Sequence, residues 1–404
     1  MKDSYFLDRA KEQAKWRLQD SINLLPSENV TSPEVRSLLS SDFGHRYTLP
    51  VNALWAGEYI ENSYRGTRIT TEIERSAEKV ACAVFRAEHA CVQPLGGHIA
   101  AMIALLSVSK KGDSICSIPV SCGGYDGYAQ PYLPDILGLT SWELPFSKKI
   151  YNLDAERCAA AIRKKKPNVV VLGASFILFP YEMGPIRDAC EDAGSFLIYD
   201  GSHVMGLIAG GEFQSPLDEG ADILYGSTHK SFFGPQGGLI LTRREDLHSA
   251  IKKNLTWRIV DNVHWNRVAA LGHALLEMRR FGKRYARQVV KNAQALGREL
   301  SERGFPVKYK ELNFTKSHQL LIDANRLRRK FGLGLNDFSI RMERSNIIID
   351  SVGRLGTAEL TRLGADEQDM REIAELFIDA ANGKDVRGAV RRKRREMKVI
   401  FRLS

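Results

Sequence analysis

The sequence predicts an α/β protein, with a large domain built on a mostly parallel β-sheet and a small α+β domain toward the C-terminus. Two observations support this prediction. Short apolar runs recur between about residues 114 and 241 and are separated by stretches with helical periodicity, which is typical of a buried parallel sheet. A long helical pattern over 272–300 is then followed by two more apolar runs and an amphipathic helix, which indicates the second domain.

The expected elements follow in chain order. Amphipathic periodicity predicts helices over 1–25, 71–86 and 98–109. The apolar runs predict the strands of the large domain at 114–118, 169–172, 196–199, 223–225 and 238–241. After the 272–300 helix, strands are expected at 319–322 and 347–349, and a helix over 366–381 with Gly383 at its C-terminal end. The resulting organisation is an N-terminal arm over 1–30, a large domain over 31–275 and a small domain with a basic tail over 276–404.

The composition excludes several classes of protein. The 404 residues are 44% hydrophobic and 26% charged, as in an ordinary globular protein. No stretch approaches the roughly 20 apolar residues of a membrane span, and the polar start of the chain does not resemble a secretory signal. The six cysteines are scattered without metal-ligand spacing, so no metal is expected. We therefore expect a cytoplasmic protein with no membrane partner.

The formal net charge of +10 is concentrated at the C-terminal end, where residues 391–395 read Arg-Arg-Lys-Arg-Arg. Such a run is compatible with an arm that binds nucleic acid or with a charged, solvated helix. No aromatic residues are interleaved with the run, and no nucleic-acid-binding motif accompanies it. The second interpretation is therefore favoured, and a nucleic-acid partner is not expected.

Polar residues follow three of the expected strands at their carboxyl ends. Asp200-Gly-Ser-His203 comes after the 196–199 strand, Ser227-Thr-His-Lys230 after the 223–225 strand, and Ser175 shortly after the 169–172 strand. Ligands of open parallel sheets bind beyond the carboxyl ends of the strands. Because an acid, a histidine and a lysine are costly to bury there without a bound partner, these residues predict a ligand site.

Pyridoxal phosphate is a ligand that fits these groups. Its aldehyde reacts with a lysine, and its pyridine nitrogen needs a carboxylate that keeps the ring protonated and therefore an electron sink. Its phosphate needs backbone N–H groups at a helix N-terminus, which Gly96-Gly97-His98 offers before the helix expected at 98–109. Each signal is weak alone. The ordered set predicts a pyridoxal-phosphate enzyme with Lys230 as the lysine that carries the cofactor.

The same motifs resemble the serine hydroxymethyltransferase family, and most closely its archaeal branch. That family has the aspartate-aminotransferase-like fold, fold type I of the pyridoxal-phosphate enzymes. The resemblance extends from Leu24 to about Ala381. Its best segments are Leu25-Pro-Ser-Glu-Asn-Val-Thr-Ser-Pro33, Asp200-Gly-Ser-His-Val-Met-Gly-Leu-Ile-Ala-Gly-Gly-Glu-Phe213, Ser227-Thr-His-Lys-Ser-Phe-Phe-Gly-Pro-Gln-Gly-Gly238 and Gly353-Arg-Leu-Gly-Thr357.

The resemblance implies roles for the residues at the strand ends. Asp200 would pair with the pyridine nitrogen, and His203 would lie near the ring and its 3′-oxygen, which Ser175 would also contact. Ser227 and the catalytic His229 would flank the bond between Lys230 and the cofactor. The implied phosphate site is the turn Gly96-Gly97-His98.

Two residues are implied to bind the amino-acid substrate. Arg354 resembles the family arginine that grips the substrate carboxylate, a task suited to the two parallel hydrogen bonds of a guanidinium. The alternative is a surface salt bridge. Ser27 resembles a serine that helps to bind the same carboxylate, and its alternative is the N-cap of a helix.

The acid–base residues of the family come from the neighbouring subunit of a homodimer. Tyr47 and Tyr64 fit its two tyrosines, with Tyr47 binding substrate and Tyr64 acting in catalysis. Glu58 is the choice for the catalytic glutamate, but the stretch 48–63 is longer than its family counterpart. Glu61 therefore competes for that role.

Several positions depart from the family pattern. Tyr125, in Ser121-Cys-Gly-Gly-Tyr125, would stack on the cofactor ring where the family has a histidine, and His98 stands where it has Ser or Thr. The segment between Ile349 and Arg354 is shorter than the family loop that shapes the pterin side of the pocket. Asp261-Asn-Val-His264 replaces a two-glycine motif that reaches the partner's phosphate.

The function implied is interconversion of serine and glycine by retro-aldol cleavage. A reduced pterin, tetrahydrofolate or a tetrahydromethanopterin-like compound, would carry the one-carbon unit. The departures keep other readings open: a pterin-independent aldolase or transaldolase acting on threonine or another β-hydroxy amino acid, or an α-methylserine-type hydroxymethyltransferase. A non-catalytic binding protein is disfavoured because Lys230 and Asp200 are both present.

Overall fold

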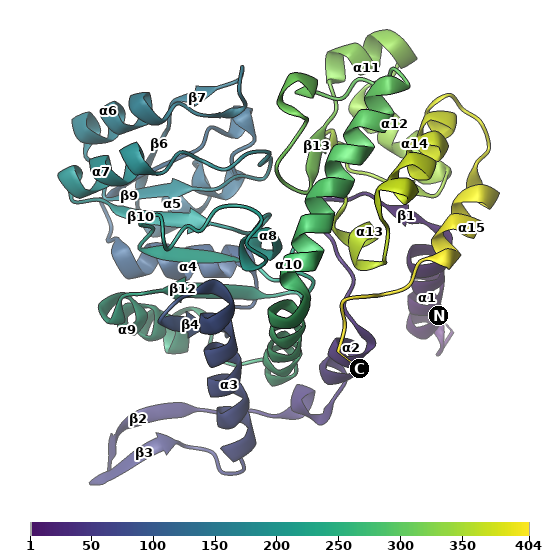
Figure 1. Ribbon diagram of the computed structural model, residues 1–404. Helices are drawn as coiled ribbons and strands as arrows, with labels where there is room; N and C mark the ends of the chain where they lie inside the picture. The colour runs from purple at the N-terminus through teal and green to yellow at the C-terminus, as the bar shows by residue number, and fades with distance from the viewer. Residues whose placement is uncertain (1, 404) are drawn as a thin grey trace. The chain divides into compact units, whose positions relative to one another are not determined.

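The computed structural model describes residues 2–403, apart from the side chains of residues 51, 52 and 257. The chain divides into two compact units (Figure 1). The large unit contains Thr31–Lys283, and the small unit combines the residues up to Val30 with Arg284–Arg402. The boundary falls inside the long helix α10 (Trp265–Glu302), so this helix contributes to both.

The large unit is built on a seven-stranded sheet with the order β4-β12-β11-β10-β9-β5-β6. Its strands are β4 (His89–Cys91), β5 (Ser114–Ser117), β6 (Thr140–Glu143), β9 (Val169–Leu172), β10 (Phe196–Asp200), β11 (Ile223–Ser227) and β12 (Gly238–Thr242). Strand β12 runs antiparallel to both of its neighbours, and the other pairs are parallel. The expected strands and the mostly parallel sheet are therefore confirmed.

Helices cover both faces of this sheet (Figure 1). Helices α4 (Gly97–Val108) and α9 (Glu245–Asn254) pack on one face, where their apolar side chains form one core with alternate strand residues such as Val169, Val171 and Ile198. Helices α6 (Ala155–Lys165) and α7 (Gly184–Ala193) lie on the other face. Because both faces are covered, all four residues of β9 are buried, which explains its continuous apolar run.

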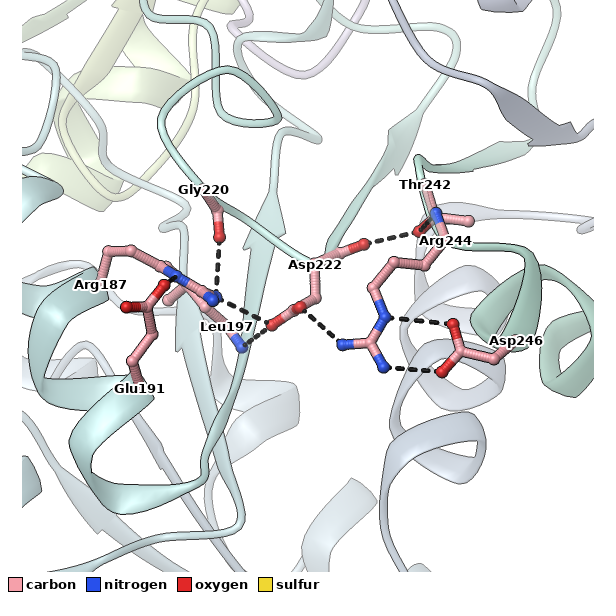
Figure 2. A network of polar contacts seen from close by, with 8 residues as sticks. All are labelled: Arg187, Glu191, Leu197, Gly220, Asp222, Thr242, Arg244 and Asp246. Carbon is pink, nitrogen blue, oxygen red and sulfur yellow. Dashed lines mark hydrogen bonds and ion pairs between the residues drawn. The ribbon is translucent and has the colours of Figure 1, made fainter.

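A buried carboxylate fastens the amino-terminal edge of this sheet (Figure 2). Asp222, directly before β11, accepts hydrogen bonds from the backbone N–H of Leu197 at 2.8 Å, from Arg187 at 3.3 Å and from Arg244 at 3.0 Å. Arg244 also binds Asp246 in the first turn of α9. One side chain thus joins α7, β10 and the beginning of α9.

The rest of the large unit consists of shorter elements and one projecting hairpin. The α-helices are α2 (Pro33–Leu39), α3 (Arg68–Phe85), α5 (Leu133–Leu137) and α8 (Met205–Ala209), and the small strands are β2 (Pro50–Trp55), β3 (Glu58–Asn62), β7 (Phe146–Ser147) and β8 (Asn152–Leu153). Single-turn helical segments lie at Asp42–His45, Val120–Cys122, Asp126–Tyr128 and Leu255–Ile259. Strands β2 and β3 pair in a hairpin whose tip exposes Leu54, Trp55 and Tyr59.

The small unit has its own core. Its strands form two pairs, β1 (Ile22–Asn23) parallel to β14 (Ile347–Ile348) and β13 (Gln319–Leu321) antiparallel to β15 (Arg354–Gly356). Its helices are α1 (Tyr5–Lys15), α11 (Ala324–Phe331), α12 (Leu335–Arg344), α13 (Ala358–Arg362), α14 (Glu367–Ala381) and α15 (Arg387–Glu396), with helical turns at Trp16–Asp20 and Lys310–Leu312. The apolar face of α14, including Ile373 and Phe377, packs into this core.

The expected N-terminal helix over 1–25 is wrong in its second half. The α-helix ends at Lys15 and is followed by one π-helical turn, after which Ile22 and Asn23 form β1. Both residues are fully or almost fully buried and pair with β14. The tertiary contact with a distant strand therefore overrides the helical periodicity of this segment.

The basic run near the C-terminus forms α15, and much of its charge is engaged within the small unit. Arg391 and Arg395 lie 3.2 and 3.3 Å from Asp20. Lys393 pairs with Asp369 at 2.5 Å and with Glu372 at 2.6 Å. The run is thus a charged C-terminal helix. None of the helices within residues 2–403 combines the length and apolar character of a membrane span.

A buried acid makes the stability of the small unit depend on pH. Asn23 Nδ2 donates to Glu28 at 2.9 Å and to Glu359 at 2.7 Å. Burial raises the pKa of Glu359 from 4.5 to about 7. A group with a raised pKa stabilises the folded state fully below its unfolded pKa, and this stabilisation is lost as the pH rises through its folded pKa.

We therefore expect the free energy of unfolding to fall by roughly 3 kcal/mol through Glu359 between about pH 4.5 and pH 7. The Glu359→Gln variant cannot ionise, yet it retains an oxygen that accepts from Asn23. Urea denaturation of both proteins across this range measures the difference between them. Equal pH dependence in the two proteins would show that folding does not raise the pKa of Glu359.

Candidate active site

Five loops converge at the carboxyl-terminal edge of the large-unit sheet. The segments after β4, β5, β9, β10 and β11 carry Gly97, Tyr125, Ser175, His203 and Lys230. These five strands run in the same direction, so the loops that follow them emerge at one edge. The structure thus brings together residues that are far apart in the sequence.

Lys230 lies beside His203 in this group, and its Nζ atom is 3.3 Å from His203 Nε2. Both Lys230 and His229 are half-buried, whereas Ser227 is buried at the end of β11. The backbone N–H of Ser227 donates to Ser202 Oγ at 3.2 Å. The ends of β10 and β11 are thereby tied together, which fixes the segment that leads to Lys230.

Asp200 ends β10 and is held by two neighbours. Tyr128 donates its hydroxyl to Asp200 Oδ2 at 2.7 Å, and the backbone N–H of Ser202 donates to Oδ1 at 2.9 Å. Burial raises the pKa of Asp200, while the hydrogen bonds from Ser202 and the charge of Lys230 act in the opposite direction. A cationic partner would therefore stabilise the ionised form of this buried carboxylate.

Close packing at this edge requires glycine at two positions. A Cβ atom on Gly97 would lie 2.3 Å from Ser227 Oγ, so the first turn of α4 can approach β11 only without a side chain. Gly173 has φ +147° and lies against Asp200, where a Cβ atom would be 2.4 Å from the Asp200 carbonyl oxygen. These close approaches fix the Gly96–Gly97 turn next to the strand ends.

Aromatic residues line the same edge. The Tyr125 hydroxyl is 2.8 Å from His98 Nδ1, and the rings of Tyr125 and Tyr128 meet edge to face at 5.3 Å. Gly124 bridges to Ala174, which places the Tyr125 loop beside the half-buried Ser175. Burial raises the pKa of Tyr125, so its hydroxyl stays protonated at neutral pH.

These residues fit pyridoxal phosphate. Asp200 is a buried carboxylate suited to the protonated ring nitrogen, and Lys230 is an amine within reach of the same edge. Helix α4 begins at the Gly96–Gly97 turn without a side-chain cap, so the N–H groups of its first turn are available to bind an anion. The Tyr125 ring offers an aromatic face. These four groups therefore match the ring nitrogen, aldehyde, phosphate and ring face of the cofactor.

The two candidates for binding a substrate carboxylate lie together in the small unit. The Gly356 N–H in β15 donates to Leu24 O at 2.7 Å, and a Cβ atom on Gly356 would be 2.5 Å from Pro26 Cα. The Ser27 segment and the strand that begins at Arg354 are thus in direct contact. Ser32 rather than Ser27 caps α2, accepting from Val35 N–H, so the N-cap alternative for Ser27 is wrong.

Asp350 holds Arg354 in a defined position. Arg354 Nε donates to Asp350 Oδ2 at 2.7 Å, and the exposed fractions of the two side chains are only 13% and 12%. Asp350 Oδ1 also accepts from the backbone N–H groups of Val352 and Arg354 at 3.1 and 2.9 Å. The short segment before Arg354 is therefore a turn closed by one aspartate, and its ion pair is shielded rather than exposed on the surface.

The tyrosines expected to act from a neighbouring subunit form a third group. The rings of Tyr47 and Tyr64 are 5.5 Å apart, and Tyr47 donates its hydroxyl to Asp261 at 2.8 Å. This hydrogen bond is the largest cause that raises the pKa of Tyr47. The two competing glutamates differ in their contacts: Glu58 is exposed beside the hairpin turn, whereas Glu61 pairs with Arg75 at 2.9 Å.

Two residues in these groups are absent from the sequence prediction. Tyr128 follows Tyr125 by three positions, and the aromatic content of this loop was a signal for a second ring near the cofactor. Asp350 lies in the segment that was noted only for its shortness. Each of them makes a hydrogen bond to another residue of these groups, and no local pattern in the sequence predicts that contact.

Comparison with known proteins identifies close relatives. The family model described as serine hydroxymethyltransferase matches residues 2–377. A serine hydroxymethyltransferase from Methanocella arvoryzae is 40% identical, over 93% of this chain and 89% of the relative. The corresponding protein from Methanopyrus kandleri is 38% identical, over 99% of this chain and 95% of the relative.

A solved structure with a different activity is also similar. The L-threonine transaldolase from Pseudomonas fluorescens superimposes with a TM-score of 0.88 at 25% sequence identity, covering 99% of this chain and 93% of that protein. The fold of the two proteins is therefore the same. The sequence identity is higher with the archaeal relatives than with this transaldolase.

Proposed function

The chain belongs to the serine hydroxymethyltransferase family, and from this membership we propose that it is a pyridoxal-phosphate enzyme that interconverts serine and glycine with a reduced pterin as one-carbon carrier. The observation that carries the proposal is the combination of this family match with Lys230, Asp200 and the Gly96–Gly97 turn at one sheet edge. The fold is that of the aspartate-aminotransferase-like enzymes.

In this proposal the large unit holds the cofactor. Lys230 would bind its aldehyde, Asp200 would pair with its ring nitrogen, and the turn Gly96-Gly97-His98 would bind its phosphate. Pyridoxal phosphate then supplies an electron sink for the bond that is broken. Tyr128 and Ser202 keep the Asp200 carboxylate oriented through the hydrogen bonds described above.

The other residues of this edge position the cofactor ring and manage protons. Tyr125 would stack on the ring, and Ser175 and His203 would contact its 3′-oxygen. His203 is also close enough to Lys230 to exchange a proton with its amine, since their nitrogens are 3.3 Å apart. Ser227 and His229 flank Lys230.

Arg354 and Ser27 bind the carboxylate of the amino acid. A guanidinium can hold a carboxylate through two parallel hydrogen bonds, which also fixes its orientation. Asp350 accepts from Arg354 Nε and so orients the guanidinium plane. The substrate is thereby held in one orientation, so that a defined bond at its α-carbon is presented for cleavage.

We further propose that the protein works in the cytoplasm as a homodimer, in which Tyr47, Tyr64 and Glu58 complete the active site of the partner. The exposure of all three side chains supports this assignment. Glu58 would move a proton at the substrate hydroxyl, with Tyr64 nearby in catalysis and Tyr47 binding substrate. Sedimentation of the active enzyme tests the dimer, and an active stable monomer would contradict it.

Glu58→Gln is expected to lower kcat for serine by about 10²–10⁴-fold, because it removes the proposed acid–base group. Glu61→Gln is the matched control, and we expect it to change kcat less than about tenfold because Glu61 is already paired with Arg75. Steady-state kinetics at saturating serine measures both. The reverse pattern would assign the acid–base role to Glu61.

A threonine transaldolase or aldolase is the second candidate, supported by the structural similarity to the Pseudomonas enzyme. The α-methylserine-type hydroxymethyltransferase of the sequence prediction remains a third. The altered stretch 48–63 and the short turn at Asp350 both fall where the resemblance to the transferases is weakest. These enzymes differ in whether a pterin accepts the one-carbon unit and in which β-hydroxy amino acid is cleaved.

The test of the proposed function is the visible absorbance of the purified enzyme with glycine, before and after addition of tetrahydrofolate or tetrahydromethanopterin. Absorbance that rises with one of the pterins would show that pterin and amino acid bind cooperatively, as the transferase requires. A glycine-dependent spectrum that no pterin changes, together with cleavage of threonine, would establish the second candidate instead.

A further inference from the structure

Three side chains that can bind metal lie together at the amino-terminal edge of the large-unit sheet, the edge opposite Lys230. His89 opens β4 and pairs with Thr242 at the end of β12. The other end of β12, Gly238, pairs with Ser227 at the carboxyl edge. Glu245 and His248 belong to the beginning of α9. The strand register therefore places this cluster and Lys230 at opposite edges of the sheet.

The geometry of this cluster is close to that of a metal site. His89 Nε2 is 3.3 Å from Glu245 Oε2, and the rings of His89 and His248 stack with centroids 4.8 Å apart. The atoms able to ligate all lie within 4.8 Å of one another. Adjacent ligand atoms on tetrahedral zinc are about 3.3 Å apart, given bonds of about 2.0–2.1 Å. Side-chain rotations that move these atoms by about 1–2 Å would therefore bring all three within bonding distance of one ion.

The local charges favour a cation. His248 is a half-buried residue of α9, and Lys252 lies one helical turn after it. Lys252 is already neutralised, since it lies 2.6 Å from Glu78 and 3.4 Å from Glu74. Arg244, next to Glu245, binds Asp222 and Asp246 (Figure 2). The Glu245 charge is therefore not cancelled by these neighbouring cations.

We propose that His89, Glu245 and His248 bind one divalent transition-metal ion of the zinc type, with a fourth position left to water. Two imidazoles and one carboxylate are a recurrent zinc ligand set. The ion would join the edge strand β4 to helix α9, and β4 leads directly to the Gly96–Gly97 turn. Its role is therefore to stabilise this edge of the sheet rather than to take part in the reaction.

Equilibrium dialysis of the holoenzyme against Zn²⁺, in a non-chelating buffer without amino acid, tests the proposal. We expect one equivalent bound per chain, with an affinity at least about 10-fold lower in His89→Gln, His248→Gln and Glu245→Gln. His273→Gln is the matched control, because it removes a histidine that lies outside the cluster, and it should bind like the wild type. Zn²⁺ should also raise the melting temperature of the wild type and of this control, but not of the three variants.

Two results would overturn the proposal: no Zn²⁺ bound at the wild type, or undiminished binding by His248→Gln and Glu245→Gln. Glu245 is an exposed position, so its variant tests the site even if a histidine variant fails to fold. Co²⁺ in place of Zn²⁺ identifies the ligand type. A thiolate charge-transfer band would assign the ion to a cysteine and would also contradict the proposal.

Discussion

The Lys230→Ala variant is expected to lose the visible absorbance of the lysine-bound cofactor and to lower kcat for serine by at least roughly 10³-fold. The variant removes both the covalent anchor and an amine that exchanges protons with His203, and acid–base groups contribute about 10²–10⁴-fold on their own. The side chain is half-buried, so its truncation should leave the fold intact. Absorbance, steady-state kinetics and circular dichroism on the same preparation measure the three properties.

Lys110→Ala is the matched control, because Lys110 is an exposed lysine of the large unit outside the loops described above. It should retain both the absorbance and the activity. If Lys230→Ala kept the absorbance of the lysine-bound cofactor, another lysine would be the anchor, and the assignment of the carboxyl edge as the cofactor site would be wrong.

Arg354→Lys is expected to lower kcat/KM for serine by roughly 10-fold or more, since a hydrogen bond to a charged group contributes about 1.5–3 kcal/mol. Lysine keeps the charge but has no planar fork with which to bind a carboxylate through two hydrogen bonds. Asp350→Asn should have a smaller effect, because Arg354 remains but loses its charged partner. The Asn side chain can still accept from the turn N–H groups that Asp350 Oδ1 now binds.

The control for this pair is Arg344→Lys, an exposed arginine of the small unit, which should leave kcat/KM unchanged. Kinetics must be accompanied by thermal denaturation, because the Arg354–Asp350 ion pair also closes the turn before β15. A lower melting temperature with an unchanged KM for serine would show that Arg354 only stabilises the turn. The substrate carboxylate would then need a different binding residue.

One departure from the family pattern lies where the resemblance places the cofactor ring. Where the family places a histidine, this chain has Tyr125, and the structure adds Tyr128 behind it. The two rings meet edge to face, and Tyr128 in turn donates to Asp200. An aromatic pair thus connects the residue proposed to stack on the ring with the carboxylate proposed to bind its nitrogen. Tyr125 is therefore linked, through Tyr128, to the carboxylate proposed to bind the ring nitrogen.

The sequence alone determined the fold class, the family and the positions of Lys230 and Asp200. The reason is physical. A sheet covered on both faces must have continuous apolar strands, and polar residues directly after such strands do not belong to the apolar core. The strands at 169–172, 196–199 and 223–225 were therefore correctly predicted. Segments whose structure depends on distant partners were not. Residues 22–23 become a strand only because β14 lies beside them. The hairpin of β2 and β3 was also not expected, although its strands are neighbours in the sequence.

Tertiary structure alone decided which side chains hold the site residues in place. Tyr128 reaches Asp200, Asp350 fixes Arg354, and His89 meets His248, in each case through a side-chain contact that has no periodic signal in the sequence. Residue type and spacing specify what a side chain can do and which element carries it. The partner it meets depends on how strands and loops from separate parts of the chain are brought to the same edge of the sheet, and that information is distributed over the whole core.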